Sequence, residues 1–187
     1  MDKICVFCGS SSGSDGTYEA GAAAMGRLLS DRGITLVYGG GDAGLMGAVS
    51  RAHFETGGRT IGIIPEALED KVPHRESVEL HVVEDMHKRK AMMYDMSEAF
   101  IALPGGIGTL EEFFESYTWN QIGYMDKPVG LLNTNRFYDG LIEFLDSMVE
   151  KGFLKAAHRK RLVLSDDPEE LLDLLEKAPG GYVGKWG

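Results

Sequence analysis

Long apolar runs are absent from this sequence, and none approaches the roughly 18 residues that a membrane-spanning helix requires. The first residues, Met1–Cys8, lead directly into an apolar strand and not into a basic leader with a cleavable apolar segment. The sequence therefore predicts a cytoplasmic protein with no membrane partner.

Basic residues are also scarce. The 187 residues include 19 Lys and Arg against 29 Asp and Glu, which gives a formal net charge of −10 at pH 7. Because nucleic-acid binders need basic surfaces to neutralise phosphates, DNA and RNA are not expected as partners. A small phosphate ligand held by a local site is compatible with this balance. The length suits one domain, and we expect residues 1–187 to form a single nucleotide-binding domain.

Cysteine is rare, with Cys5 and Cys8 the two present. Residues three positions apart on a strand lie roughly 10 Å from each other and point to opposite faces, so we expect buried, reduced thiols and no disulfide. No second cysteine pair could complete a zinc site, and the five histidines show no metal-binding spacing. The motifs H-E-x-x-H and Walker A are missing as well. No metal and no cofactor is therefore expected.

Glycine, in contrast, is abundant, with 25 residues that often follow short apolar runs. Apolar segments alternate with helical patterns, which predicts an α/β fold with a doubly wound, Rossmann-like parallel sheet flanked by helices. The predicted strands are Lys3–Cys8, Ile34–Tyr38, Thr60–Ile64, Leu80–Val83, Ala99–Leu103, Lys127–Leu132 and Leu162–Leu164. The predicted helices are Thr17–Arg32, a helix ending near Glu55, Met86–Met96 capped by Asp85, Thr109 to about Gln121, Phe137–Lys151 and Pro168–Lys177. We expect Glu66–Glu79 to be a mobile loop over the site and Ala178–Gly187 a frayed tail.

The strongest local signal is the segment Ala99–Glu112. An apolar strand runs into Pro104-Gly-Gly-Ile-Gly-Thr109, and Thr109 is predicted to open a helix. A strand, a glycine turn and a helix N-terminus together form an anion site, because unpaired N–H groups and the helix dipole converge there. Glu112, one turn into the helix, has two interpretations of equal weight: a capping box with Thr109, or a catalytic carboxylate. Glu111 is an alternative catalyst that would point about 100° away around the helix.

Two other segments carry residues suited to nucleotide chemistry. Gly39-Gly-Gly-Asp-Ala-Gly44 matches G-x-G-x-x-G, with Glu66 where a ribose-binding carboxylate would fall in a dinucleotide fold. A tight turn with close helix–strand packing, or a mononucleotide site, explains the same pattern. His87-Lys-Arg-Lys90 is a dense cationic cluster, which is either a solvated face or a source of one or two inward-facing cations. Arginine suits the inward role because its planar fork grips phosphate.

Two segments together resemble the Lonely Guy (LOG) family of cytokinin riboside 5′-monophosphate phosphoribohydrolases. Residues 104–112 match the family signature PGGxGTxxE, and residues 86–92 are similar to the segment MHxRKxxM. Further similarity lies in Cys8–Ser12, Val37–Gly47 and Thr118–Gln121, and it extends from about Lys3 to Pro168. Family members have often been labelled lysine decarboxylases, but no pyridoxal-phosphate lysine site is evident in this sequence.

The resemblance implies hydrolysis of the N-glycosidic bond of a nucleoside 5′-monophosphate, AMP or a prenylated AMP, to free base and ribose 5-phosphate. It also implies a homodimer with the site near the interface. By motif position, Arg89 and Glu112 carry over as catalytic residues. Glu112 would stabilise the oxocarbenium-like state at C1′, and Arg89 would orient the phosphosugar.

The resemblance also implies a set of nucleotide contacts: Lys90, Gly105, Gly106, Gly108, Thr109 and Thr118. We add Ser10, Gly41 and Met86 as candidate substrate contacts, with the purine expected near Ser10–Ser12, the loop Gly41–Met46 and a partner chain. Many relatives carry a glutamate in the loop after the third strand, where this sequence has Lys71-Val-Pro-His74. Two alternatives stay open: a nucleotide- or cofactor-binding carrier without turnover, and an NAD-dependent oxidoreductase.

Overall fold

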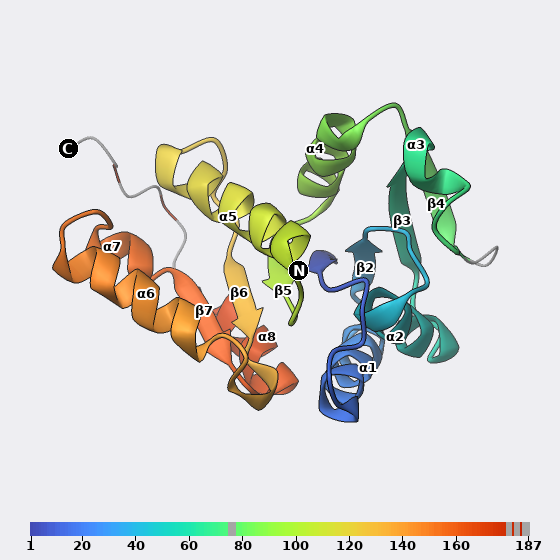
Figure 1. Ribbon diagram of the computed structural model, residues 1–187, viewed down its shortest axis with the longest axis horizontal. Coiled ribbons are helices and arrows are strands. Elements are labelled where there is room, and N and C mark those ends of the chain that lie inside the picture. Colours follow the sequence, from blue (N-terminus) through green and yellow to red (C-terminus); the bar gives the residue numbers. More distant parts are fainter. Residues whose placement is uncertain (75–77, 179–180, 182–183, 185–187) are drawn as a thin grey trace.

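The computed structural model describes residues 1–74, 78–178, 181 and 184. Within these residues, seven parallel strands form one sheet in the order β4-β3-β2-β1-β5-β6-β7 (Figure 1). The strands are β1 Lys3–Phe7, β2 Thr35–Tyr38, β3 Thr60–Pro65, β4 Glu79–Val83, β5 Ala99–Ala102, β6 Val129–Leu132 and β7 Leu162–Ser165. The predicted doubly wound parallel sheet is therefore confirmed.

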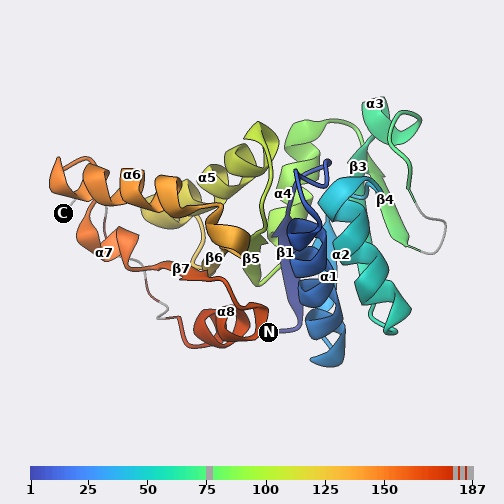
Figure 2. The ribbon, with the colours of Figure 1, turned by 60° about the horizontal axis from the view of Figure 1, so that its bottom comes forward.

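Helices cover both faces of the sheet. They are α1 Gly16–Asp31, α2 Gly44–Glu55, α3 Glu66–Glu69, α4 Met86–Met96, α5 Ile107–Ile122, α6 Asp139–Glu150, α7 Ala156–Arg159 and α8 Pro168–Glu176, with a 3₁₀ turn η1 at Thr134–Arg136. Residues of α1, α2 and α8 share one buried cluster, and residues of α4, α5 and α6 share the other. Figure 2 shows α8 below the sheet and α5 and α6 above it.

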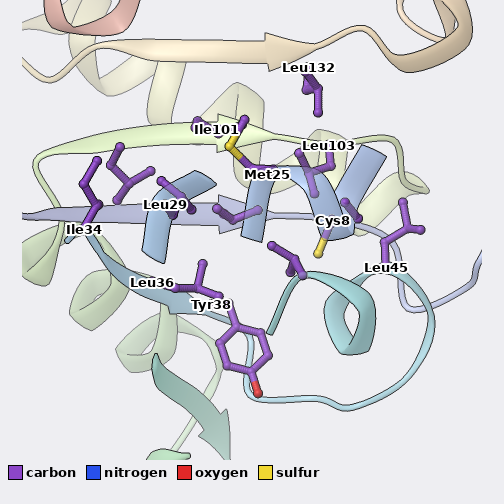
Figure 3. Close-up of a cluster of buried hydrophobic side chains, with 14 of the residues drawn as sticks. Cys8, Met25, Leu29, Ile34, Leu36, Tyr38, Leu45, Ile101, Leu103 and Leu132 are labelled. Carbon is purple, nitrogen blue, oxygen red and sulfur yellow. The ribbon is translucent and has the colours of Figure 1, made fainter. Parts of the chain in front are cut away.

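Alternation along β1 divides the core between these two faces. Ile4 and Val6 belong to the α1–α2 side, whereas Cys5 and Phe7 belong to the α4–α5 side. Both cysteines are free and buried, as the strand spacing predicts. Cys8 continues into the first cluster, where Figure 3 shows it close to the start of α2. No helix in the described part of the chain is long and apolar enough to cross a membrane.

The direction in which the chain adds strands to the sheet reverses between β1 and β5, and the candidate site lies at this point. Starting from β1, the chain adds β2, β3 and β4 on one side, crosses back through α4, and continues with β5 on the other side. The loops after β1 and β5 meet at the carboxyl edge, where Gly9 N–H donates to Pro104 O at 3.1 Å. Ligands of doubly wound sheets bind at such a switch point, where the helices that follow the two strands, here α1 and α5, go to opposite faces of the sheet.

Several predicted boundaries need correction. α5 begins at Ile107, with Gly106 as its N-cap, so Thr109 lies inside the helix and does not open it. The segment predicted as an irregular loop, Glu66–Glu79, contains the short helix α3, although residues 75–77 lie outside the described residues. The turn η1 and the helix α7 were not predicted, because each spans less than two turns. The predicted frayed tail lies mostly outside the described residues.

Candidate active site

Arg89 is held in place by two elements besides its own helix. Asp85 caps α4, accepting a hydrogen bond from Lys88 N–H at 2.8 Å, and Arg89 follows one turn later on the buried side. Its Nε donates to the carbonyl of Ile63, in β3, at 3.0 Å, and its Nη1 donates to Glu112 Oε1 at 2.8 Å. The guanidinium is therefore fixed over the carboxyl edge of the sheet.

Glu112 faces Arg89 from α5 and is 8% exposed. Burial raises the pKa of Glu112 above its ordinary value, and the charge of Arg89 and its hydrogen bond offset this in part. Because α5 starts at Ile107, Glu112 lies beyond the first turn, and its carboxylate pairs with Arg89. The capping-box interpretation is therefore wrong, and the structure shows a buried carboxylate paired with an arginine.

A cleft of about 490 Å³ opens beside this pair. The polar part of its lining carries Arg89, Glu111, Glu112 and Thr109. The apolar wall includes Met46 of α2, Leu68 of α3, Val72 and Met86 of α4. A ligand in this cleft would meet both charged and apolar side chains.

The N-terminus of α5 forms one end of the cleft, which Gly106, Ile107 and Gly108 line. The first hydrogen bond back into the helix runs from Leu110 N–H to Gly106 O at 3.1 Å. The N–H groups before Leu110 therefore have no partner within the helix, and such groups suit an anion. Gly105 is required here, since a Cβ at that position would lie 2.1 Å from Thr109 Oγ1. The phosphate site that the glycine pattern suggests stays a prediction.

The cleft brings together some of the predicted site residues and not others. Those that line it are Ser10, Met86, Arg89, Gly106, Gly108, Thr109 and Glu112. Gly105 lines a neighbouring cavity of about 270 Å³, which shares Gly9, Ser10 and Gly106 with the cleft. Gly41 does not line the cleft, but a Cβ there would lie 3.0 Å from Val72 and 3.1 Å from Met46. Thr118 is exposed on α5, about 9 Å of helix rise beyond Glu112.

Lys90 is buried, but it turns away from the cleft. Its Nζ bonds Glu111 and also lies 3.0 Å from Glu115 Oε2. The cationic cluster is thus divided: Arg89 and Lys90 are buried, whereas His87 and Lys88 are exposed. One of the two inward cations reaches the cleft, and the other joins α4 to α5.

Sequence reasoning missed several contributors to this geometry. The carbonyl of Ile63 carried no signal, because a backbone acceptor is independent of residue type. Gly39 makes room for Arg89, since a Cβ there would lie 2.2 Å from Nη2. Tyr94 and Glu115 belong to the contacts between α4 and α5. Helical spacing could have suggested these two, as each lies one turn beyond a member of the Lys90–Glu111 pair.

Comparisons with known proteins show which family this chain resembles. The model of a family described as "possible lysine decarboxylase" matches residues 46–175. The chain is 49% identical over 176 residues to the cytokinin riboside 5′-monophosphate phosphoribohydrolase LOG3 of Arabidopsis thaliana, covering 94% of this chain and 82% of that one. The identity is again 49% with the probable phosphoribohydrolase LOGL2 of Oryza sativa subsp. japonica, over 94% and 72% of the two chains.

Solved structures share the fold at lower identity. The molybdenum cofactor carrier protein of Chlamydomonas reinhardtii superposes with a TM-score of 0.72 at 20% identity, over 95% of this chain and 97% of that one. The molybdenum cofactor binding protein of Rippkaea orientalis gives a TM-score of 0.67 at 23% identity, over 94% and 96%. At these identities the likeness shows the fold alone.

Proposed function

The chain belongs to the LOG family of cytokinin riboside 5′-monophosphate phosphoribohydrolases, and from that premise we propose that it hydrolyses the N-glycosidic bond of a nucleoside 5′-monophosphate. The substrates are cytokinin riboside 5′-monophosphates, AMP or both, and the products are the free base and ribose 5-phosphate. One observation carries the proposal: a buried carboxylate, paired with an arginine, shares a cleft with an open helix N-terminus.

The spacing of these two features suits a phosphosugar. From Ile107 to Glu112 the helix rises about 7.5 Å, on the scale of a ribose ring with its 5′-phosphate. The phosphate would accept hydrogen bonds from the free N–H groups at the start of α5, where the helix dipole favours negative charge. The ribose would then lie beneath Glu112, and the base would extend toward the apolar wall.

Glu112 and Arg89 have different roles in the proposed reaction. Cleavage breaks the bond between C1′ and the base nitrogen, and positive charge develops on C1′ and the ring oxygen. The Glu112 carboxylate stabilises that charge and can take a proton from the water that adds to C1′. Arg89 keeps its proton and so cannot supply one to the leaving base; it orients Glu112 and the phosphosugar. The proton on the released base comes from another donor.

The proposal includes a homodimer in which Thr118 acts across the interface. Thr118 is exposed on α5 and does not line the cleft of its own chain. Apolar side chains are exposed at both ends of the helix region, with Ile107 83% and Tyr124 76% accessible. A second copy packed on this face would cover them and bring its own Thr118 toward the neighbouring cleft.

Substitution of the carboxylate tests the activity. AMP, isopentenyl-AMP, GMP, CMP and adenosine are incubated with the purified protein, and free base is measured by chromatography. We expect release of base from at least one adenine ribotide, poor reaction of adenosine, and a loss of at least about 100-fold in Glu112→Gln. Glu84→Gln, an exposed carboxylate paired with Lys88, is the matched control and should retain activity.

Each alternative gives a different result in the same experiment. Thermal stabilisation by AMP without release of adenine would indicate a carrier. Binding of NAD(H) together with survival of AMP would indicate an oxidoreductase. If wild type and Glu112→Gln release adenine at the same rate, the proposed role of Glu112 is wrong; loss of activity in Glu111→Gln alone would move that role to the neighbouring residue.

A further inference from the structure

Two neighbouring cations of α4 bind different carboxylates of α5. Arg89 pairs with Glu112 inside the cleft, while Lys90 pairs with Glu111 at the edge of the cleft and with Glu115, which does not line it. The side chain of Lys90 is 11% exposed, so its ammonium depends on these carboxylates for compensation. Lys90 is absent from the residues that line the cleft.

Glu115 connects this pair to a second contact between the helices. The hydroxyl of Tyr94, one turn after Lys90 on α4, donates to Glu115 Oε2 at 2.5 Å. The carbonyl of Tyr94 in turn accepts a hydrogen bond from Lys127 Nζ at 2.6 Å, which joins the end of α4 to the segment before β6. The two helices are therefore fixed to each other within one turn of the Arg89–Glu112 pair.

We propose that Lys90 and Glu115 are positioning residues for the hydrolysis and not nucleotide contacts. The link between them sets the separation and rotation of α4 against α5, and so places Arg89 opposite Glu112. It also commits the Lys90 ammonium to Glu111 and Glu115, so that Glu112 presents one oxygen to Arg89 and the other to the sugar. This inference rests on the proposed function, because a positioning role requires a reaction to position.

The two possible roles of Lys90 predict different kinetics. A phosphate or ribose contact binds the ground state and the transition state alike, so its loss raises KM and leaves kcat unchanged. A positioning residue acts through the geometry of Arg89 and Glu112, and a misplacement on the order of 1 Å can cost up to about 100-fold in rate. Glu115 separates the roles further, since it lies outside the cleft and has no reason to change KM.

The experiment is a double-mutant cycle on the steady-state hydrolysis of the preferred ribotide. We expect Lys90→Met and Glu115→Gln each to lower kcat about tenfold, with KM within about twofold of the wild type. The double variant should be no slower than the slower single variant, because both changes break one link. Lys90→Arg, which keeps the charge, should regain most of kcat. The affinity for ribose 5-phosphate, measured by calorimetry, should be unchanged in Lys90→Met.

Matched controls lie on the same helix. Lys88→Met and Glu84→Gln remove an exposed ion pair of the same type, and both variants should behave as wild type.

A rise of tenfold or more in KM, or an equal loss of affinity for ribose 5-phosphate, in Lys90→Met would overturn the proposal and make Lys90 a ligand contact. Additive effects in the double variant would overturn it as well. If the wild type hydrolyses no ribotide, both the proposed function and this inference fail. If the wild type is active and Glu115→Gln has the same kcat, only this inference is wrong.

Discussion

The guanidinium of Arg89 lies against residue 39, and only glycine leaves enough space for it there. Its Nε and Nη1 are committed to Ile63 O and Glu112, and its Nη2 lies against the backbone of Gly39 at the end of β2. Gly39 does not have a positive φ, so its backbone imposes no need for glycine. The requirement for glycine at this position therefore comes from the arginine, and a turn pattern alone could not reveal it.

Gly39→Ala tests this relation between a glycine and the proposed catalytic arginine. The added Cβ would lie 2.2 Å from Nη2 and must displace the guanidinium, so we expect kcat to fall at least about tenfold while the protein stays folded. Gly140→Ala, where the new Cβ meets no atom within 4 Å, is the control and should keep full activity. Steady-state kinetics measures kcat of both variants, and thermal unfolding shows whether they are folded. Full activity in Gly39→Ala would show that the pose of Arg89 is not needed.

At the scale of an element, the start of α5 shows which part of the site a sequence can reveal. The glycines and the strand before them predict the anion cradle, because any chain that turns from a buried strand into a helix exposes N–H groups there. The exact helix start was mispredicted, because Thr109-x-x-Glu112 is also a capping box. Gly106 takes the N-cap position with extended φ and ψ, and Thr109 packs over Gly105.

Gly108→Ala separates the stability of α5 from its role as a phosphate cradle. Gly108 lies in the first turn, and a Cβ there meets no atom within 4 Å, so alanine should raise the free energy of unfolding by up to about 1 kcal/mol. The same methyl group lines the cleft and should raise KM for AMP several-fold. Denaturant unfolding and kinetics measure the two effects. A more stable variant with an unchanged KM would place the phosphate elsewhere.

Short apolar strands and capped helices were predicted well from the sequence, and the side-chain contacts between elements were not. β1, β5 and the cap of α4 at Asp85 were predicted from local pattern, because burial on both faces and capping depend on nearby residues. The pairing of Lys90 with Glu115 depends on how α4 and α5 pack against each other. No local pattern contains that information, so Lys90 was predicted as a nucleotide contact on its motif position alone.

At the scale of the whole molecule, His53 makes stability depend on pH. It is fully buried between α2, β2 and β3, with Nδ1 2.8 Å from Thr60 Oγ1 and Nε2 2.9 Å from Ile34 O. Burial lowers the pKa of His53 below its ordinary value of 6.5, and the hydrogen bond to Ile34 offsets part of this. The unfolded chain therefore binds a proton near pH 6.5, while the folded chain binds it only at lower pH.

The contribution of His53 to the free energy of unfolding should be fully present above pH 6.5. It should decline as the pH falls toward the lowered pKa of His53 in the folded state. The slope is at most about 1.4 kcal/mol per pH unit for one proton. Denaturant unfolding at several pH values between 5 and 7.5 measures it. His53→Gln should be less stable but lack this part of the slope, while His81→Gln, a partly exposed control, should retain it. An identical slope in His53→Gln would assign the pH dependence to other groups.

The proposed dimer predicts that two inactive variants recover activity when they are combined in one dimer. If Thr118 reaches the partner's cleft, Thr118→Arg and Glu112→Gln are each inactive as pure dimers, but a hybrid of the two has one site with an intact Glu112 and an intact Thr118. Random exchange puts half of the molecules in hybrids with one working site of two, so the mixture should recover about a quarter of wild-type activity. Unfolding and refolding the two variants together, followed by gel filtration and a kinetic assay, tests this. Because Thr118 is exposed on its own chain, a folding defect in Thr118→Arg is not expected. No recovery in a mixture that elutes as a dimer would confine each site to one chain.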